Sequence, residues 1–353
     1  MHKQFAAGLV TLSLGVLGSC SNDTGTLNEN EAGSSESGDG GAAQAGGPVT
    51  GGLGGTVGPG GEAGDEGNSS AGAPPIDELG DQAGAGGEPP GVGGVGNTPT
   101  VRIATFNIQN FGPTKLSRPE VMAELVEIVR GYPFVAVQEI SDVNQKVPFG
   151  FLEMINSDGA SYEMLLSPRS GLESDDKTYQ EQYAFYYDAT VISAQSEGQL
   201  YDDSPNDFFV REPYVARFEV LDGGFTFVAI TVHTQPDGAV AEIGHLEDVV
   251  NWAKDEFPDE DDFIVLGDLN AGCSYASPAE LDALELRTSD YVWIVPDGAD
   301  TNLAMSMCAY DRVILTASTS TNYAGAWGVD ASFTSTMVSD HWPVWAEFWA
   351  VER

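Results

Sequence analysis

The sequence is poor in basic residues, with 14 Lys and Arg against 54 Asp and Glu in 353 residues. Residues 100–353 hold 13 of the basic and 42 of the acidic residues, a formal net charge of 13 − 42 = −29. A field of this sign repels polyanions at long range, so charge alone argues against nucleic acid as a partner. It also motivates the hypothesis that the protein works in high monovalent or divalent salt.

Cysteine is scarce as well, with Cys20, Cys273 and Cys308 as the three thiols. In an exported chain the even pair Cys273 and Cys308 predicts a disulfide, while two free buried thiols are the alternative. Closing a loop of this length stabilises a fold by roughly 3–4 kcal/mol on the chain-entropy estimate.

The first twenty residues hold an apolar run that is too short to span a membrane. A basic start precedes the run and small residues follow it, which is typical of a secretion signal. The segment "LGSC" resembles the bacterial lipoprotein cleavage box, which implies a signal peptide over residues 1–19 and a lipid on Cys20. Ordinary signal cleavage beside an incidental cysteine is the alternative. We expect an exported protein, either a lipoprotein of the outer membrane or cell surface, or a secreted one.

Aromatic residues are absent from residues 21–99, which are rich in Gly, Ser, Ala, Asp and Glu. Such a segment buries too little apolar surface to offset its ordering entropy, so residues 20–99 are predicted to be a disordered tether. The stretch "GVGGVG" fits a nucleotide-loop pattern, but no strand precedes it and no helix follows, so chance explains it.

Residues 100–353 are long enough for one large domain. Apolar runs bounded by turns predict strands at 101–108, 133–140, 183–188, 213–220, 225–233, 262–270, 311–316 and 341–350. Helical periodicity follows Ser117, taken as the cap residue, and covers 238–257. Strands with interspersed helices indicate a mixed α/β sandwich.

Polar residues of metal-ligand or acid/base type end most of these strands. Each has an ordinary structural explanation, such as a turn amide or a solvated strand end, but their recurrence favours a shared site at one sheet edge. The group comprises Asn107, Glu139, Glu181, His233, Asp268, Asn270, Asp311, Asp340 and His341.

Carboxylates and amides without thiolates suit a hard cation such as Mg²⁺, Mn²⁺ or Ca²⁺. Two histidines, each with an acid available, suit one general base and one general acid. A cation would neutralise charge on a phosphate. Together these groups indicate metal-dependent phosphoester hydrolysis.

Ordered motifs over residues 101–349 resemble the deoxyribonuclease I family, namely "RIATFNIQNFG", "VAVQEI", "TYQEQYAF", "REPYVARF", "VHTQPDGAVAEI", "GDLNAGCSY", "RTSDY", "MCAYDRVIL" and "SDHWPV". The resemblance implies a four-layer α/β/β/α sandwich and the Cys273–Cys308 disulfide. "SDH" alone marks only the wider endonuclease/exonuclease/phosphatase superfamily.

The resemblance also implies roles for individual residues. His341 would be the general base, polarised by Asp311, and His233 with Glu181 the acid, although the two roles are exchangeable. Glu139 and Asp340 would hold a catalytic Mg²⁺ or Mn²⁺. The remaining implied contacts are Asn107, Asp268 and Asn270 in the metal and phosphate pocket, Arg211 and Tyr310 on phosphate, and Tyr179 against a deoxyribose.

Two loops resemble structural Ca²⁺ sites of the family. The first holds Asp203, Asp207, Phe209 through its carbonyl, and Glu212. The second keeps Asp300, but Asn302, Ala304 and Ser306 replace a run of threonines. Solvated acidic loops are the alternative for both.

Gln109 and Ser141 stand where the family carries arginines that contact DNA. Fewer cationic contacts imply weaker binding with a shallower salt dependence. The resemblance therefore implies a monomeric endodeoxyribonuclease of low sequence specificity, with DNA as substrate and the membrane as a partner through Cys20. Another phosphodiesterase or phosphatase of the superfamily, acting on a lipid headgroup or an inositol phosphate, is the nearest alternative. A catalytically silent surface-binding protein is a remote one.

Overall fold

Strands with alternating apolar residues build two mixed sheets in the computed structural model, which describes residues 99–171 and 180–353. The first sheet has the order β12-β13-β1-β2-β4-β3. Its strands are β1 Thr100–Phe111, β2 Phe134–Ile140, β3 Tyr162–Leu166, β4 Gln182–Asp188, β12 Tyr323–Val329 and β13 Val344–Trp349. All neighbours in this sheet are antiparallel except β1 and β2.

The second sheet has the order β10-β11-β9-β8-β7-β5, with β6 also paired to β7. Only β8 and β9 are parallel neighbours. The strands are β5 Ile192–Ala194, β6 Gln199–Leu200, β7 Tyr214–Val220, β8 Thr226–His233, β9 Phe263–Asp268, β10 Tyr291–Trp293 and β11 Asp311–Thr316.

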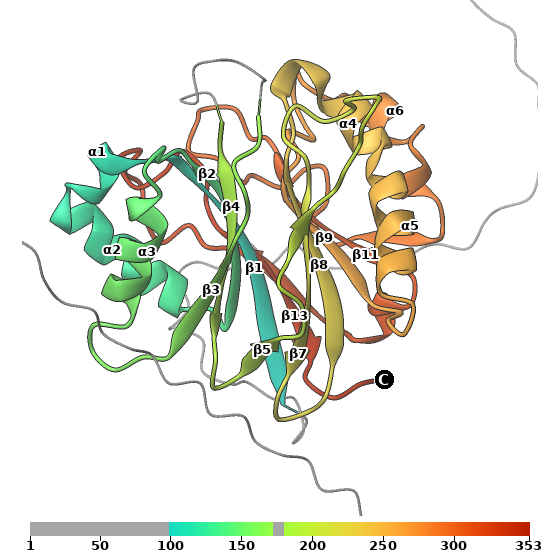
Figure 1. Cartoon of the computed structure of the whole chain (residues 1–353). Helices are drawn as coiled ribbons and strands as arrows, with labels where there is room; N and C mark the ends of the chain where they lie inside the picture. Colours follow the sequence, from blue (N-terminus) through green and yellow to red (C-terminus); the bar gives the residue numbers. More distant parts are fainter. Residues whose placement is uncertain (1–98, 172–179) are drawn as a thin grey trace, which may run out of the picture. The chain divides into compact units, whose positions relative to one another are not determined.

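Helices cover the outer face of each sheet (Figure 1). The helices of the first half are α1 Pro113–Leu116, α2 Pro119–Arg130 and α3 Lys146–Ile155. Those of the second half are α4 Ala239–Gly244, α5 Leu246–Glu256 and α6 Pro278–Leu281. Short 3-10 turns lie at Pro236–Gly238, Glu285–Arg287 and Thr319–Thr321.

Three apolar clusters correspond to the interfaces between these layers. One joins inward residues of both sheets, such as Phe134 and Phe227, whose rings lie 5.6 Å apart. A second lies under α2 and α3, and a third under α4 and α5. Stacked apolar layers of this kind bury both faces of each sheet, so the predicted four-layer sandwich is confirmed.

Strand direction brings the polar strand ends to the same end of the sheets, which is called the edge here. Strands β1 and β2 run parallel and finish there, whereas their antiparallel neighbours β13 and β4 begin there. The second sheet repeats this arrangement, because parallel β8 and β9 finish where antiparallel β11 begins. Strand β1 packs across β9, so the two edges meet. This topology gathers the predicted site residues.

Two local irregularities shape this edge. The pairing of β1 with β2 shifts register after Asn107, and Glu139 adopts a left-handed φ of 62°. A β-bulge at a sheet rim re-aims a side chain, and a left-handed non-glycine residue costs of order 1–3 kcal/mol. In the second sheet Gly267 has a φ of 155°, and a Cβ there would lie 2.0 Å from the Val232 carbonyl oxygen. Glycine therefore permits the close β8–β9 approach beside His233 and Asp268.

The predicted helices form with two corrections. The helix expected after Ser117 begins at Pro119, and its N-cap residue is Arg118 without a side-chain cap. The helix expected over 238–257 is divided at His245 into α4 and α5. All eight predicted strands form, and β3, β5, β6, β10 and β12 were not predicted.

Several predictions fall outside the described residues. These are the signal peptide over 1–19, the lipid site Cys20, the tether over 20–99 up to residue 98, and the substrate contact Tyr179. All described residues belong to the unit Glu78–Arg353. Across residues 99–171 and 180–353, no helix has the length and apolar character needed to cross a membrane.

Candidate active site

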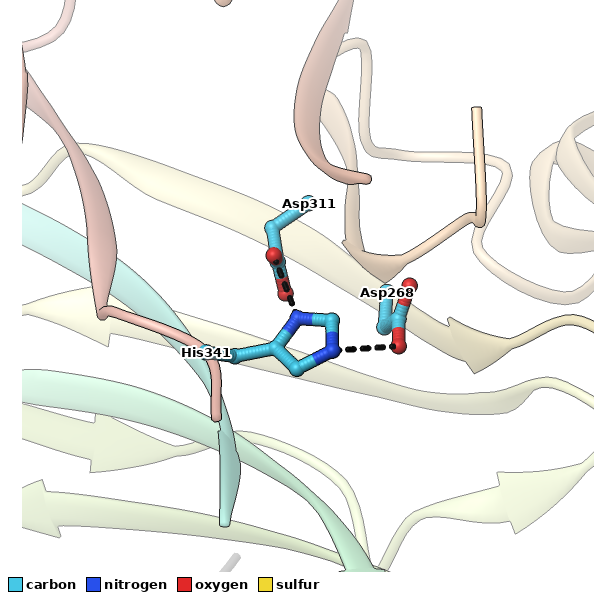
Figure 2. A group of neighbouring side chains, drawn as sticks. All are labelled: Asp268, Asp311 and His341. Atoms are coloured by element: carbon cyan, nitrogen blue, oxygen red, sulfur yellow. Dashed lines mark hydrogen bonds and ion pairs between the residues drawn. The ribbon is translucent and has the colours of Figure 1, made fainter. Parts of the chain in front are cut away.

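His341 is held between two buried carboxylates (Figure 2). Its Nδ1 lies 2.8 Å from Asp311 Oδ2, and its Nε2 lies 3.7 Å from Asp268 Oδ2. Asp311 begins β11 and Asp268 ends β9, where they are paired residues of the antiparallel ladder. A hydrogen bond at Nδ1 fixes the orientation of the ring, so Nε2 is directed toward the space that Asp268 borders.

His233 makes a matching arrangement from the end of β8. Its Nδ1 lies 2.9 Å from Glu181 Oε2, and its Nε2 lies 3.6 Å from the same Asp268 oxygen. Arg211 contacts both members of this pair. Its Nε donates to the His233 carbonyl at 2.9 Å, and its Nη1 lies 3.6 Å from Glu181 Oε1. The two predicted histidine–carboxylate pairs are therefore brought together around one aspartate.

The electrostatics of the pairs follow from burial and charge. Burial opposes protonation of His341, but Asp311 and Asp268 outweigh it and raise the His341 pKa to about 10. The pKa of His233 is raised in the same way, because Glu181 and Asp268 outweigh burial and the repulsion from Arg211. For Asp268, burial is outweighed by the two histidines, which hold its carboxyl pKa below the usual value.

A second group of oxygens surrounds Asn107. The Asn107 amide donates to Glu139 Oε1 and to Asp268 Oδ2, both at 2.9 Å. Within the described part of the chain, the buried oxygens Asn107 Oδ1 and Asp340 Oδ1 have no hydrogen-bond partner. Unpaired buried oxygens beside carboxylates are what a hard cation requires, so these residues fit a Mg²⁺ or Mn²⁺ ion.

Asp268, Asp311 and His341 also have ligand atoms within 4.8 Å of one another. In that triplet, however, Nδ1 and Nε2 of His341 already face the two carboxylates. Asp311 Oδ1 is also without a partner, but both ring nitrogens of His341 are taken up by the two carboxylates, so the orphan oxygens of Asn107 and Asp340 mark the better cation position.

Two further predicted residues border the same edge. Asn270 donates from its backbone to Asp268 Oδ1 at 3.0 Å and from its side chain to the Thr234 carbonyl at 3.0 Å. The Tyr310 ring lies 5.9 Å from the His341 ring. Asn270 thus holds Asp268 in place, and Tyr310 flanks His341.

Three residues around the cation position were not predicted. Gln109 donates to Asp340 Oδ2 at 2.6 Å, and Ser339 Oγ donates to the Asn107 carbonyl at 2.7 Å. Lys115 Nζ donates to the Val338 carbonyl at 2.7 Å. Burial lowers the Lys115 pKa to about 8, although Glu139 and Asp340 oppose the change. Their only sequence signal is position, because Gln109 and Ser339 lie within the motifs "NIQNFG" and "SDH" and Lys115 lies three residues after the first.

The predicted disulfide is present between Cys273 and Cys308, with Cα atoms 5.6 Å apart. It connects the loop after β9 with the segment before β11. Both segments carry site residues, Asn270 on one side and Tyr310 on the other. The cross-link therefore fixes the part of the edge that surrounds Asp268 and Asp311.

The first predicted calcium loop gathers several carboxylates. Asp203 Oδ2 accepts from the Phe209 N–H at 2.9 Å, and Asp203 borders a cleft together with Glu212. Burial raises the Glu212 pKa, and the carboxylates of Asp203 and Asp207 add to the rise. Mutual repulsion of this kind is relieved by a cation, so the loop fits Ca²⁺.

The second predicted calcium loop is closed by an amide. Asn302 Nδ2 lies 3.3 Å from Asp300 Oδ1 and 3.2 Å from each of the carbonyls of Ser306 and Cys308. Oxygens that already accept N–H groups have less capacity to bind an ion, and one amide occupies three oxygens here, whereas in the first loop a single Asp203 oxygen accepts the Phe209 N–H. The residues of this loop therefore fit Ca²⁺ less well than those of the first.

Comparison with known proteins agrees with this geometry. Residues 104–341 match the model of the Endonuclease/Exonuclease/phosphatase family. Human deoxyribonuclease-1 is 33% identical over 267 residues, which cover 69% of this chain and 91% of that protein. Mouse deoxyribonuclease-1-like 2 is 33% identical over 269 residues, covering 72% of this chain and 94% of that protein.

Solved structures show the same fold at low identity. An endonuclease/exonuclease/phosphatase family protein from Bacteroides thetaiotaomicron superimposes with a TM-score of 0.51 at 16% identity, covering 70% of this chain and 94% of that one. The matched family region contains both histidine–carboxylate pairs and the oxygens around Asn107. This chain therefore belongs to the endonuclease/exonuclease/phosphatase family, as a member similar to deoxyribonuclease I.

Proposed function

We propose that this protein is a metal-dependent endodeoxyribonuclease that hydrolyses DNA phosphodiester bonds with little sequence specificity. One observation carries the proposal: Nε2 of His233 and Nε2 of His341 lie 3.6 and 3.7 Å from the same oxygen of Asp268. Phosphodiester hydrolysis needs a base for the attacking water and an acid for the departing oxygen. Two oriented imidazoles at one site supply both.

The two histidines divide this work according to protonation. Each Nδ1 is held by a carboxylate, so each Nε2 is the atom that exchanges a proton with the reacting groups. His341, the base in the family pattern, has a pKa raised to about 10, because two carboxylates outweigh its burial. At neutral pH a ring with this pKa is protonated and cannot accept a proton. The base role therefore requires a positive charge near Asp268 and Asp340 that lowers the His341 pKa, and without that charge His341 suits the acid role. His233 takes the complementary role.

A catalytic Mg²⁺ or Mn²⁺ would be held by Glu139 and Asp340, with Asn107, Asp268 and Asn270 completing the pocket. The unpaired oxygens Asn107 Oδ1 and Asp340 Oδ1 support this part of the proposal. When bound, the ion supplies positive charge that stabilises the phosphate in the transition state. Arg211 and Tyr310 would contact the phosphate, and Tyr179 would pack against a deoxyribose.

Calcium would bind the first loop through Asp203, Asp207, the Phe209 carbonyl and Glu212. Burial is the largest cause of the raised Glu212 pKa, and the nearby carboxylates of Asp203 and Asp207 raise it further. This convergence of carboxylates supports the site. We assign the second loop, with Asp300, a weaker calcium site because Asn302 donates to its oxygens.

We further propose the layout of an exported lipoprotein or secreted enzyme. Its parts are a signal peptide over 1–19, a lipid on Cys20, a tether over 20–99 and a catalytic domain over 100–353 that acts as a monomer. A disulfide persists in oxidising compartments, so the Cys273–Cys308 bond supports export.

The test is nicking of supercoiled plasmid by the full-length protein with Mg²⁺ and Ca²⁺. EDTA and His341→Ala should each abolish conversion to open-circle and linear DNA. His245→Ala is the control for loss of an imidazole, because His245 pairs with Asp248 at the α4–α5 junction and belongs to neither pair. Its ring also stacks on Phe208 of the first calcium loop, so the comparison is made at saturating Ca²⁺. Intact plasmid from the folded wild type would contradict DNA as the substrate and favour a lipid-headgroup or inositol phosphodiester. Gln109 supports that alternative. It stands where the family carries an arginine that contacts DNA, and here its amide is bonded to Asp340 instead.

A further inference from the structure

Met305 and Met307 are the two most exposed large apolar residues among those the structure describes. Their relative exposures are 105% and 70%, and the next in rank, Phe149, is at 52%. Isolated exposed apolar side chains are ordinary, but two such methionines within three residues of one loop favour contact with another molecule.

The loop that carries the methionines is firmly held. Thr301 Oγ1 accepts the backbone N–H of Tyr310 at 3.1 Å and that of Asp311 at 3.2 Å. Asn302 bonds the carbonyls of Ser306 and Cys308 from inside the loop, and Cys308 is joined to Cys273. With its backbone fixed on both sides, the loop presents Met305 and Met307 to solvent in the folded protein.

The same loop lies directly beside the active site. The Leu303 N–H donates to the Asp340 carbonyl at 2.8 Å, and the Trp342 N–H donates to the Thr301 carbonyl at 2.9 Å. Asn302 also forms an isolated antiparallel bridge with His341. The exposed methionines therefore flank the segment that carries Asp340 and His341, where a phosphodiester would react.

The loop offers no positive charge to a phosphate. Its sequence over 300–308, "DTNLAMSMC", contains no Lys or Arg, and Asp300 adds a negative charge. An exposed aromatic ring lies on the same side of His341, since Tyr275 is 37% exposed and its ring is 5.6 Å from that of Tyr310, which adjoins His341. Groups with this character match the uncharged parts of a nucleic acid, its sugars and base edges.

We propose that Met305 and Met307 form an apolar contact surface for the DNA substrate, against the deoxyriboses and base edges of nucleotides beside the scissile phosphate. The inference rests on the proposed function and deepens it. Methionine is flexible and polarizable, so it accommodates different bases without reading their hydrogen-bonding edges. Apolar contact is also insensitive to salt, which offsets the missing arginines at Gln109 and Ser141 in a strongly acidic protein.

The experiment compares two substrates in the full-length protein at high NaCl. The double variant Met305→Ser/Met307→Ser should raise KM for a short DNA duplex by about fivefold or more, because thioether burial is lost. Its kcat on the duplex, and its kcat on bis(4-nitrophenyl) phosphate, should change by less than about twofold, because the catalytic pairs are untouched. Met305→Leu/Met307→Leu should keep the wild-type KM.

Leu221→Ser is the matched control, because Leu221 is 46% exposed and follows the end of β7 at the opposite edge of the sheet from His233. An unchanged duplex KM in the double serine variant would overturn the inference, as would equal losses on both substrates. Loss of binding to anionic vesicles with an intact duplex KM would assign the surface to lipid and overturn it too. If the wild type cleaves bis(4-nitrophenyl) phosphate but no DNA, the proposed substrate fails instead.

Discussion

Nδ1 of His341 lies 2.8 Å from Oδ2 of Asp311, and the side chain of Asp311 is completely buried at the start of β11. The carboxylate both orients the ring and stabilises its protonated form. The opposite nitrogen, Nε2, is thereby left to the reaction. The value of this contact is measurable by changing one atom of the acid.

Asp311→Asn should preserve the fold and lower kcat by roughly 10²–10⁴-fold, because an amide orients the wrong tautomer and loses the charge that supports an imidazolium. The measurement is hydrolysis of a small phosphodiester, with circular dichroism to verify folding. Glu181→Gln should give a comparable loss at His233. Activity within about tenfold of wild type in either folded variant would contradict the paired roles.

Calcium should stabilise the protein through the first loop. At a hundredfold excess over Kd, one bound ion adds about 2.7 kcal/mol, which corresponds to roughly 5–10 °C in Tm for a domain of this size. The expected result is a rise of this order in the wild type with millimolar Ca²⁺, and little rise in Asp203→Asn/Glu212→Gln. Differential scanning calorimetry measures both.

Asp300→Asn is the control for that experiment, because Asn302 already closes the second loop. This variant should keep most of the calcium-induced rise. If it loses the rise while the first-loop variant keeps it, the assignment of the two loops is reversed.

The sequence predicted the polar edge because apolar runs bounded by turns predict strands, and because polar residues of metal-ligand or acid/base type recur at their ends. The eight runs became strands, and topology then brought Glu181, His233, Asp311 and His341 together. The contact of Glu139 with Asn107 depends on a register shift and on a left-handed residue. No local pattern encodes these features, because they arise from tertiary packing.

Other features were hidden for particular reasons. Strand β12 contains Gly325 and Gly328, which weaken a strand pattern, yet Gly328 leaves the space that Trp345 fills. The helical pattern over 238–257 is continuous in the sequence, but the helix is interrupted at His245. The His245 ring stacks on Phe208, with ring centres 3.8 Å apart. The sequence marked Gln109 only as standing where the family carries an arginine, and the structure shows its bond to Asp340.

Asp262 predicts a pH-dependent stability. Burial, followed by repulsion from Glu352 and Glu260, raises its pKa to about 7. A folded pKa above the unfolded value of 3.8 means that the stabilisation is complete below about pH 4 and is lost as the pH rises through 7. Glu352→Gln removes one repelling charge, so it should raise Tm by about 2–4 °C near pH 8 and change it little near pH 4.

Thermal unfolding at the two pH values checks this prediction. Glu127→Gln, a change of one exposed acid on α2, is the control for the reduction in net charge. A larger gain in Tm at pH 4 than at pH 8 would show that repulsion between Glu352 and ionised Asp262 does not cause the pH dependence.

Salt sensitivity should respond to a single added cation at the site edge. Ser141 follows β2 directly, and its Oγ lies 3.0 Å from the position of a Cβ on Gly112, next to the β1 end that carries Asn107. Each phosphate contact by a cation steepens the slope of log affinity against log salt by about 0.9. Ser141→Arg should therefore lower KM for duplex DNA at low NaCl and steepen the slope of log(1/KM) against log salt by roughly one unit.

Thr190→Arg is the control, because it adds the same charge after the far end of β4, so it should leave the slope unchanged. Equal slopes for Ser141→Arg and the wild type would show that DNA does not pass this edge, whereas equal steepening by both variants would show that net charge governs binding.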